Sequence, residues 1–177
     1  GPSGEALVRL AREGSSLIVT VDCGAMAHEA LAAAHAEGVD VIVVDHHKCP
    51  PELPITAALV NPNRLDESDE AALHGHLAAV GVAFLLAVAT VRTLRARGYF
   101  DGRPAPDLMG LLDLVALGTV ADVAQLKGLN RALVAQGLKV MAKRENTGLA
   151  ALIDASRLNR APTCSDLGFA LGPRINA

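Results

Sequence analysis

The first 61 residues alternate between short apolar runs and amphipathic stretches. Residues 17 to 21, 39 to 44 and 57 to 61 are apolar runs with many β-branched side chains, which predicts strands. Residues 5 to 14 and 26 to 38 carry apolar side chains at helical spacing and end in glycine, which predicts helices. Continuously apolar strands joined by a helix are typical of a parallel sheet covered on both faces. The pattern therefore predicts an α/β fold with a parallel β-sheet flanked by helices.

The pattern changes at residue 62. Residues 62 to 76 are polar and acidic, which predicts a loop, and the remainder is dominated by helical spacing. We expect one compact body, residues 1 to 177, in which residues 1 to 61 form the sheet region and residues 62 to 177 are mainly helical, because a chain of this length rarely forms a second independent core. The predicted helices of the second half span residues 77 to 97, 107 to 117, 129 to 144 and 147 to 155.

Composition narrows the cellular setting. The longest apolar run, residues 77 to 91, is shorter than the roughly 20 residues that span a bilayer, so it predicts a buried helix and no membrane partner. The chain does not open on a signal-peptide pattern. Cys23, Cys49 and Cys164 are odd in number and lack CxxC spacing, which fits reduced thiols better than disulfides. We expect a cytoplasmic protein.

Charge is distributed unevenly along the chain. Residues 1 to 89 carry 4 Lys/Arg against 12 Asp/Glu, whereas residues 90 to 177 carry 12 against 7. An acidic half suits cation binding and a basic half suits phosphate, although two differently solvated surfaces explain the asymmetry equally well. Aromatic residues make up only 2% of the chain, which limits the stacking of side chains on nucleic-acid bases.

Polar side chains follow the first two predicted strands directly. Asp22 follows the first strand, and Asp45, His46 and His47 follow the second. Ligands of open parallel sheets bind beyond the carboxyl ends of the strands, so these groups are expected to converge. Mixed oxygen and imidazole ligands favour Mn²⁺, Zn²⁺ or Fe²⁺, and Mg²⁺ to a lesser degree. Two adjacent imidazoles point in different directions, which predicts that one binds metal and the other binds substrate or a carboxylate.

A third acidic position lies in the second half. Asp122 follows a Gly118-Thr119 pair that is predicted to end the preceding helix. Each isolated aspartate also has a purely structural explanation. Asp122 can serve as a helix N-cap, and Asp22 as a turn or cap residue.

Several segments together resemble a known family. "VTVDCG", "VVDHH", "LGTVADV", "LNRALV" and "LGPRINA" have the order and spacing of the DHH phosphoesterase superfamily, and within it of the bacterial RecJ-type single-strand-specific exonucleases. The resemblance implies two bound divalent ions, Mn²⁺ or Mg²⁺. It also implies 5′-to-3′ hydrolysis of single-stranded DNA in repair and recombination.

The resemblance also assigns roles. Asp22 would be shared between the two ions, and His46 and Asp122 would bind one of them. His47 would contact the scissile phosphate, and Asp45 would orient the histidines. Two neighbouring cations lower the pKa of bound water and stabilise the attacking and leaving oxygens.

Substrate contacts are expected in the basic half. Arg131, Arg174 and Asn176 lie in the matching segments "LNRALV" and "LGPRINA", and Arg160 is added from charge alone. The implied partners are single-stranded DNA and the remaining domains of a longer polypeptide. A single-strand-binding protein is a further candidate.

One departure from the family is large. Its first motif, an aspartate-rich turn, has no counterpart before Asp22, where the only acidic residues are Glu5 and Glu13. We therefore expect a fragment of the catalytic core that lacks this motif. A pyrophosphatase, or a phosphodiesterase of small oligonucleotides or cyclic dinucleotides, would use the same ligands, and a catalytically silent module that binds nucleotide or a protein is the alternative from another class. A generic nucleotide-binding fold is less favoured because no GxGxxG follows the first strand.

Overall fold

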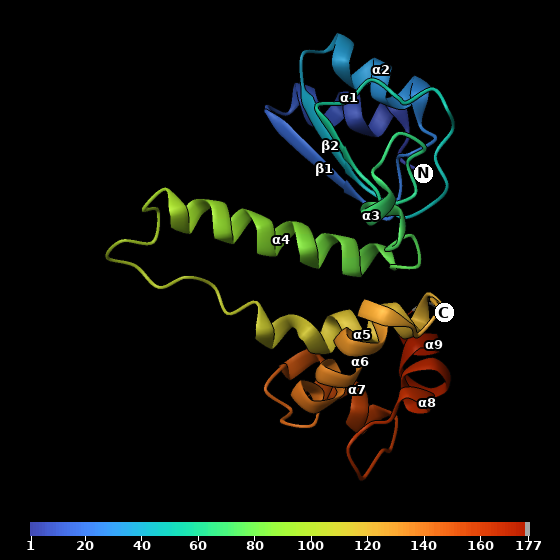
Figure 1. Cartoon of the computed structure of the whole chain (residues 1–177), viewed down its shortest axis with the longest axis vertical. Helices are drawn as coiled ribbons and strands as arrows, with labels where there is room; N and C mark the ends of the chain where they lie inside the picture. The colour runs from blue at the N-terminus through green and yellow to red at the C-terminus, as the bar shows by residue number, and fades with distance from the viewer. Residues whose placement is uncertain (176–177) are drawn as a thin grey trace. The chain divides into compact units, whose positions relative to one another are not determined.

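The computed structural model describes residues 1 to 175. The chain forms two compact units (Figure 1). The first unit is Gly1–Gly75 and the second begins at His76. Each unit contains its own cluster of buried hydrophobic side chains within the described part of the chain. The described residues thus form two hydrophobic clusters, where the length of the chain predicted one core. The cluster of the helical half includes Leu117, Val134 and Met141, which lie on α5 and α6.

The first unit is built around a three-stranded parallel sheet of order β1-β2-β3. Leu17 lies opposite Asp40 and Val21 lies opposite Val44, so β1 and β2 end at the same edge. This confirms the predicted β-α-β unit. The elements of the unit are α1 (Gly4–Arg12), β1 (Leu17–Val21), α2 (His28–Ala36), β2 (Asp40–Val44), β3 (Ala58–Val60) and α3 (Asp69–Ala72).

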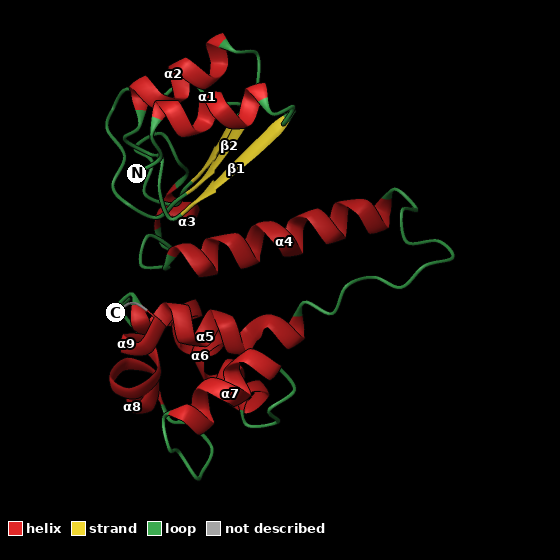
Figure 2. Cartoon of the chain, turned by 180° about the vertical axis from the view of Figure 1, so that it is seen from behind, coloured by secondary structure: helices red, strands yellow, loops and turns green. Residues whose placement is uncertain are grey.

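Helices α1 and α2 lie on the same side of the sheet (Figure 2). They pack on a face that includes Ile18, Val43 and Leu59, which belong to one hydrophobic cluster with Leu7 of α1. The alternate side chains of β1 are about half exposed: Leu17 at 51%, Val19 at 50% and Val21 at 49%. Helices α1 and α2 therefore cover one face of the sheet, and the predicted class, a parallel sheet flanked by helices, is confirmed.

The second unit is helical. It begins with the long helix α4 (Ala79–Ala96), and its hydrophobic cluster is formed by side chains of α5, α6, α7 and the π-helical segment η2. Its remaining elements are η1 (Met109–Leu111), α5 (Leu112–Ala121), α6 (Gly128–Met141), α7 (Thr147–Ala155), α8 (Cys164–Asp166), η2 (Leu167–Leu171) and α9 (Gly172–Ile175).

Helix α4 differs from its prediction in burial. Only 17% of this helix is buried, although its mean hydropathy is 1.6, so most residues of the expected buried helix are half-buried or exposed. Of the described residues, α4 alone forms a helix long and apolar enough to cross a bilayer. One such helix is weak evidence for a membrane span, because core helices of globular proteins have the same length and composition.

Two other local predictions are wrong. The predicted loop 62 to 76 contains the short helix α3, which begins because the Ser68 hydroxyl accepts a hydrogen bond from the Ala71 N–H at 3.2 Å. Helix α5 does not end at Gly118-Thr119 but continues to Ala121. At Gly118 an added Cβ would lie 2.9 Å from a methyl carbon of Val80, so this glycine allows close helix packing and does not end the helix.

Candidate metal centre

Asp22 occupies a tight turn at the end of β1. Its N–H extends the ladder by donating to the Val44 carbonyl at 2.9 Å, and its φ of 64° lies in the left-handed region. Two residues later, Gly24 has a φ of 121°, and a Cβ there would lie 2.9 Å from a methyl carbon of Val43. Only glycine fits this position, so the "VDCG" turn leaves the Asp22 carboxylate at the carboxyl edge of the sheet.

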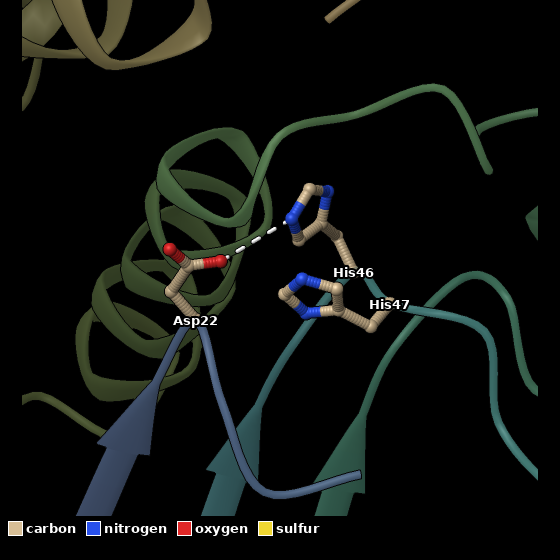
Figure 3. A group of neighbouring side chains, drawn as sticks. All are labelled: Asp22, His46 and His47. Atoms are coloured by element: carbon tan, nitrogen blue, oxygen red, sulfur yellow. Dashed lines mark ion pairs between the residues drawn. The ribbon is translucent and has the colours of Figure 1, made fainter. Parts of the chain in front are cut away.

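His46 and His47 extend from the end of β2 toward Asp22 (Figure 3). His46 Nε2 lies 3.2 Å from Asp22 Oδ1, and the two imidazole centroids are 4.5 Å apart with their planes inclined by 62°. One potential ligand atom from each of Asp22, His46 and His47 lies within 4.8 Å of the others. The structure therefore brings these three predicted side chains together at one sheet edge.

Asp45 lies beneath the two histidines and is 1% exposed. Its Oδ1 accepts the backbone N–H groups of His46 at 2.8 Å and His47 at 3.3 Å, and it lies 2.7 Å from His47 Nδ1. Its Oδ2 accepts the Ala25 N–H at 3.0 Å. Burial raises the pKa of Asp45, but these hydrogen bonds outweigh burial and leave the pKa below its usual value.

An ionised Asp45 fixes the tautomer of His47. A carboxylate beside Nδ1 requires the proton on that nitrogen, so Nε2 carries the lone pair of a neutral ring. A carboxylate behind a histidine is the usual support of a metal ligand. One carboxylate oxygen and two imidazole nitrogens suit a borderline divalent ion such as Mn²⁺, with water completing its coordination. Asp22, His46 and His47 therefore fit a metal ion.

Asp122 belongs to the second unit and is the C-cap of α5. Its backbone has φ −76° and ψ 0°, and its N–H donates to the Gly118 carbonyl at 2.9 Å. The interpretation as a helix N-cap is therefore wrong, because the helix before Asp122 continues past Thr119. The convergence of Asp122 with Asp22 and His46 stays a prediction.

The predicted substrate contacts also belong to the second unit. Arg131 is exposed on α6, and Arg174 of α9 donates to the Ala170 carbonyl at 2.7 Å. Arg160 donates to both carboxylate oxygens of Asp166, at 2.6 and 3.0 Å. Asn176 lies outside the described residues. The roles of these four residues in substrate binding stay predictions.

Two asparagines near the histidines were missed by sequence reasoning. Asn61 donates to the His47 carbonyl at 2.8 Å, and Asn63 donates to the His46 carbonyl at 2.6 Å. The signal was available, because Asn61 directly follows β3 and so ends at the same sheet edge as Asp22 and Asp45. It was missed because uncharged amides bind metals and move protons less readily than carboxylates and imidazoles.

Comparison with known proteins identifies a family. The model of the DHH family, N-terminal domain, matches residues 2–119. The single-stranded-DNA-specific exonuclease RecJ of Dickeya dadantii is 46% identical over 181 aligned positions, which cover 100% of this chain and 31% of that protein. The chain thus spans less than a third of the length of this relative.

Solved structures give the same result. A crystal structure of exonuclease RecJ bound to manganese matches 96% of this chain and 40% of its own, with a TM-score of 0.72 and 36% identity. RecJ from Thermus thermophilus in complex with Mn²⁺ matches 98% of this chain and 24% of its own, with a TM-score of 0.73 and 35% identity. With the family model covering most of its length and the Asp-His-His segment at the edge of a parallel sheet, the chain belongs to the DHH family.

Proposed function

We propose that this chain is part of the catalytic core of a RecJ-type exonuclease, which hydrolyses single-stranded DNA from the 5′ end with Mn²⁺ or Mg²⁺. The observation that carries the proposal is the grouping of Asp22, His46 and His47 within 4.8 Å. The similarity to RecJ over the whole chain supports it, as do the manganese-bound relatives. The remaining domains of a longer polypeptide would complete the protein.

The geometry suggests a division of labour. Asp22 Oδ1 and His46 Nε2 lie 3.2 Å apart and would hold the ion from the ends of two neighbouring strands. When bound, a divalent ion lowers the pKa of a water molecule and polarises the phosphate. His47 is more exposed than His46, with 59% of its side chain accessible against 16%, which suits contact with an incoming phosphate. Asp45 keeps the His47 ring oriented from the buried side.

Residues of the second unit would add to this site. We assign Asp122 as a further ligand, and Arg131, Arg160, Arg174 and Asn176 as contacts to the DNA backbone. Arg160 is the least favoured, because both carboxylate oxygens of Asp166 already accept from its guanidinium. A cytoplasmic location and a single-strand-binding partner remain predictions from the sequence.

The test is a metal-dependent nuclease assay on 5′-labelled single-stranded DNA. Two polypeptides are compared, the 177-residue chain and one extended upstream through a further strand, each with an Asp22→Ala control. We expect weak Mn²⁺ binding and almost no digestion by the chain alone, and Asp22-dependent digestion by the longer polypeptide. A single ion does not stabilise both the attacking and the leaving oxygen, so we expect the chain alone to digest DNA several orders of magnitude more slowly than the longer polypeptide.

Three results would contradict this proposal. Robust Asp22-dependent digestion by the 177-residue chain would show that no further ligands are needed. Nucleotide binding that is unaffected by removing Mn²⁺, with no digestion by either polypeptide, would instead indicate a catalytically silent binding module. Hydrolysis of pyrophosphate or of cyclic dinucleotides in preference to DNA would identify another phosphoesterase of the family.

A further inference from the structure

We propose that Asn61 and Asn63 are positioning residues that hold the peptide backbone of His46 and His47, and thereby place both imidazoles for the ion and the phosphate. This inference rests on the proposed function and adds the residues that fix its geometry. Neither asparagine is counted among the metal ligands, since each acts through a histidine.

Asn61 is nearly inaccessible, with 3% of its surface exposed. Its amide nitrogen donates to the His47 carbonyl at 2.8 Å, while its amide oxygen accepts the Asn63 N–H at 2.8 Å. Because the oxygen faces an N–H donor, the amide group has only one orientation that satisfies both partners. Asn61 therefore ties the His47 peptide to the end of β3.

Asn63 makes the matching contact to His46. Its amide nitrogen donates to the His46 carbonyl at 2.6 Å and to the Gly75 carbonyl at 3.0 Å. Gly75 lies so close that a Cβ at this position would collide with Asn63 Oδ1. The missing side chain of Gly75 is thus what leaves room for the Asn63 amide.

Each histidine is consequently held on both sides of its residue. Asp45 accepts the N–H groups of His46 and His47, and the two asparagines donate to their carbonyls. The segment between β2 and β3 contains no helix or strand, so regular secondary structure does not fix the backbone conformation of His46 and His47. A metal site needs its ligands placed to within about 0.5 Å, and such placement depends on supporting hydrogen bonds.

The same three strand ends supply all of these groups. Asp22 follows β1, Asp45 follows β2 and Asn61 follows β3. The parallel register brings the three ends to one edge, with Val44 paired to both Val21 and Val60. The third strand therefore contributes to the site through support of the histidines and not through a ligand.

The experiment compares Asn63→Ala and Gly75→Ala with Arg64→Ala in the 177-residue chain. Asn63→Ala removes the donor, and Gly75→Ala displaces the same amide while retaining it. Arg64→Ala is the matched control, because Arg64 supports the same turn by donating to the Leu59 carbonyl at 2.9 Å and pairing with Asp66. Mn²⁺ dissociation constants are measured by electron paramagnetic resonance, and the imidazole nitrogen signals by NMR without metal. Thermal unfolding confirms that each variant is folded.

We expect Asn63→Ala and Gly75→Ala to weaken Mn²⁺ binding by about tenfold or more, as is usual for groups that support metal ligands, and to shift the His46 ring signals without metal. Arg64→Ala should lower stability yet leave both readouts unchanged. Equal Mn²⁺ affinities and unchanged ring signals in all three variants would overturn the inference. Equal weakening by Arg64→Ala would also overturn it, because the asparagine would then support only the fold. Absence of Mn²⁺ binding by the unaltered chain would overturn the proposed function instead, and the metal-free ring signals would still decide the role of Asn63.

Discussion

Asp45→Asn is the most informative single change at the site, because it keeps the shape of a buried side chain while removing one acceptor oxygen and the charge. The remaining amide oxygen should stay on the side of His46 and His47, where Asp45 Oδ1 meets three nitrogen atoms. The new NH₂ group then faces the Ala25 N–H, which now donates to Oδ2 at 3.0 Å. The NH₂ group and the Ala25 N–H are both donors, so they would face each other without an acceptor, and Ala25 is only 1% exposed.

The magnitude follows from these contacts. A lost hydrogen bond to a charged group costs about 1.5 to 3 kcal/mol, and a buried donor left without an acceptor costs about 1 to 3 kcal/mol. Because the two effects share one geometry they will not add fully, so we expect the free energy of unfolding to fall by about 2 to 4 kcal/mol.

Urea unfolding of the metal-free chain, followed by circular dichroism, measures this difference. The matched control is Asp40→Asn, an aspartate exposed at the start of β2, which should change stability by less than about 0.5 kcal/mol. A loss of less than about 1 kcal/mol for Asp45→Asn relative to this control would refute the reasoning, since it would mean that the carboxylate contributes little to holding its four donors.

Three further predictions concern the second unit. Gly137→Ala should destabilise the chain by about 1 to 3 kcal/mol in urea unfolding, because a Cβ there would collide with α5, whereas Gly148→Ala should not. Hydrogen bonds from Arg160, and then from Thr163, lower the pKa of Asp166. The stability difference between the unaltered chain and Asp166→Asn should therefore be full above the unfolded-state pKa of about 3.9 and shrink as the pH falls below it, as acid titrations of both proteins would show. In the longer polypeptide, Arg174→Ala should weaken single-strand binding and reduce its salt slope by about 1, and an unchanged slope would count against this contact.

The sheet and its edge were predictable from sequence because two independent patterns agree there. Apolar β-branched runs indicated the strands, and polar groups at their ends indicated the site, so Asp22 and His46 could be placed together without a structure. The order β1-β2 follows from the single helix between the strands. The same reasoning places Asn61 at the end of the third strand. It does not show, however, that a buried amide matters more to the site than an exposed histidine elsewhere in the chain.

Burial was predicted less well than secondary structure. Val19 and the exposed residues of α4 are as apolar as core residues, so composition alone does not distinguish them from buried residues. The end of α5 was misplaced for a related reason. Gly118 was interpreted as a break, although its lack of a side chain serves a close contact with Val80. A glycine signals either a turn or a close approach, and only the partner, which is distant in sequence, distinguishes them.

The site itself shows where sequence patterns stop being sufficient. Adjacent histidines suggested a division of roles, but the division depends on Asp45 reaching His47 Nδ1 at 2.7 Å while His46 Nε2 faces Asp22 at 3.2 Å. These distances depend in turn on backbone groups held from residues 61 and 63, more than a dozen positions away. The chemistry of the "DHH" segment is therefore local in sequence, whereas its geometry is set by the neighbouring strand ends. An asparagine that touches neither metal nor substrate should consequently affect metal affinity, as the paired changes at Asn63 and Gly75 can show.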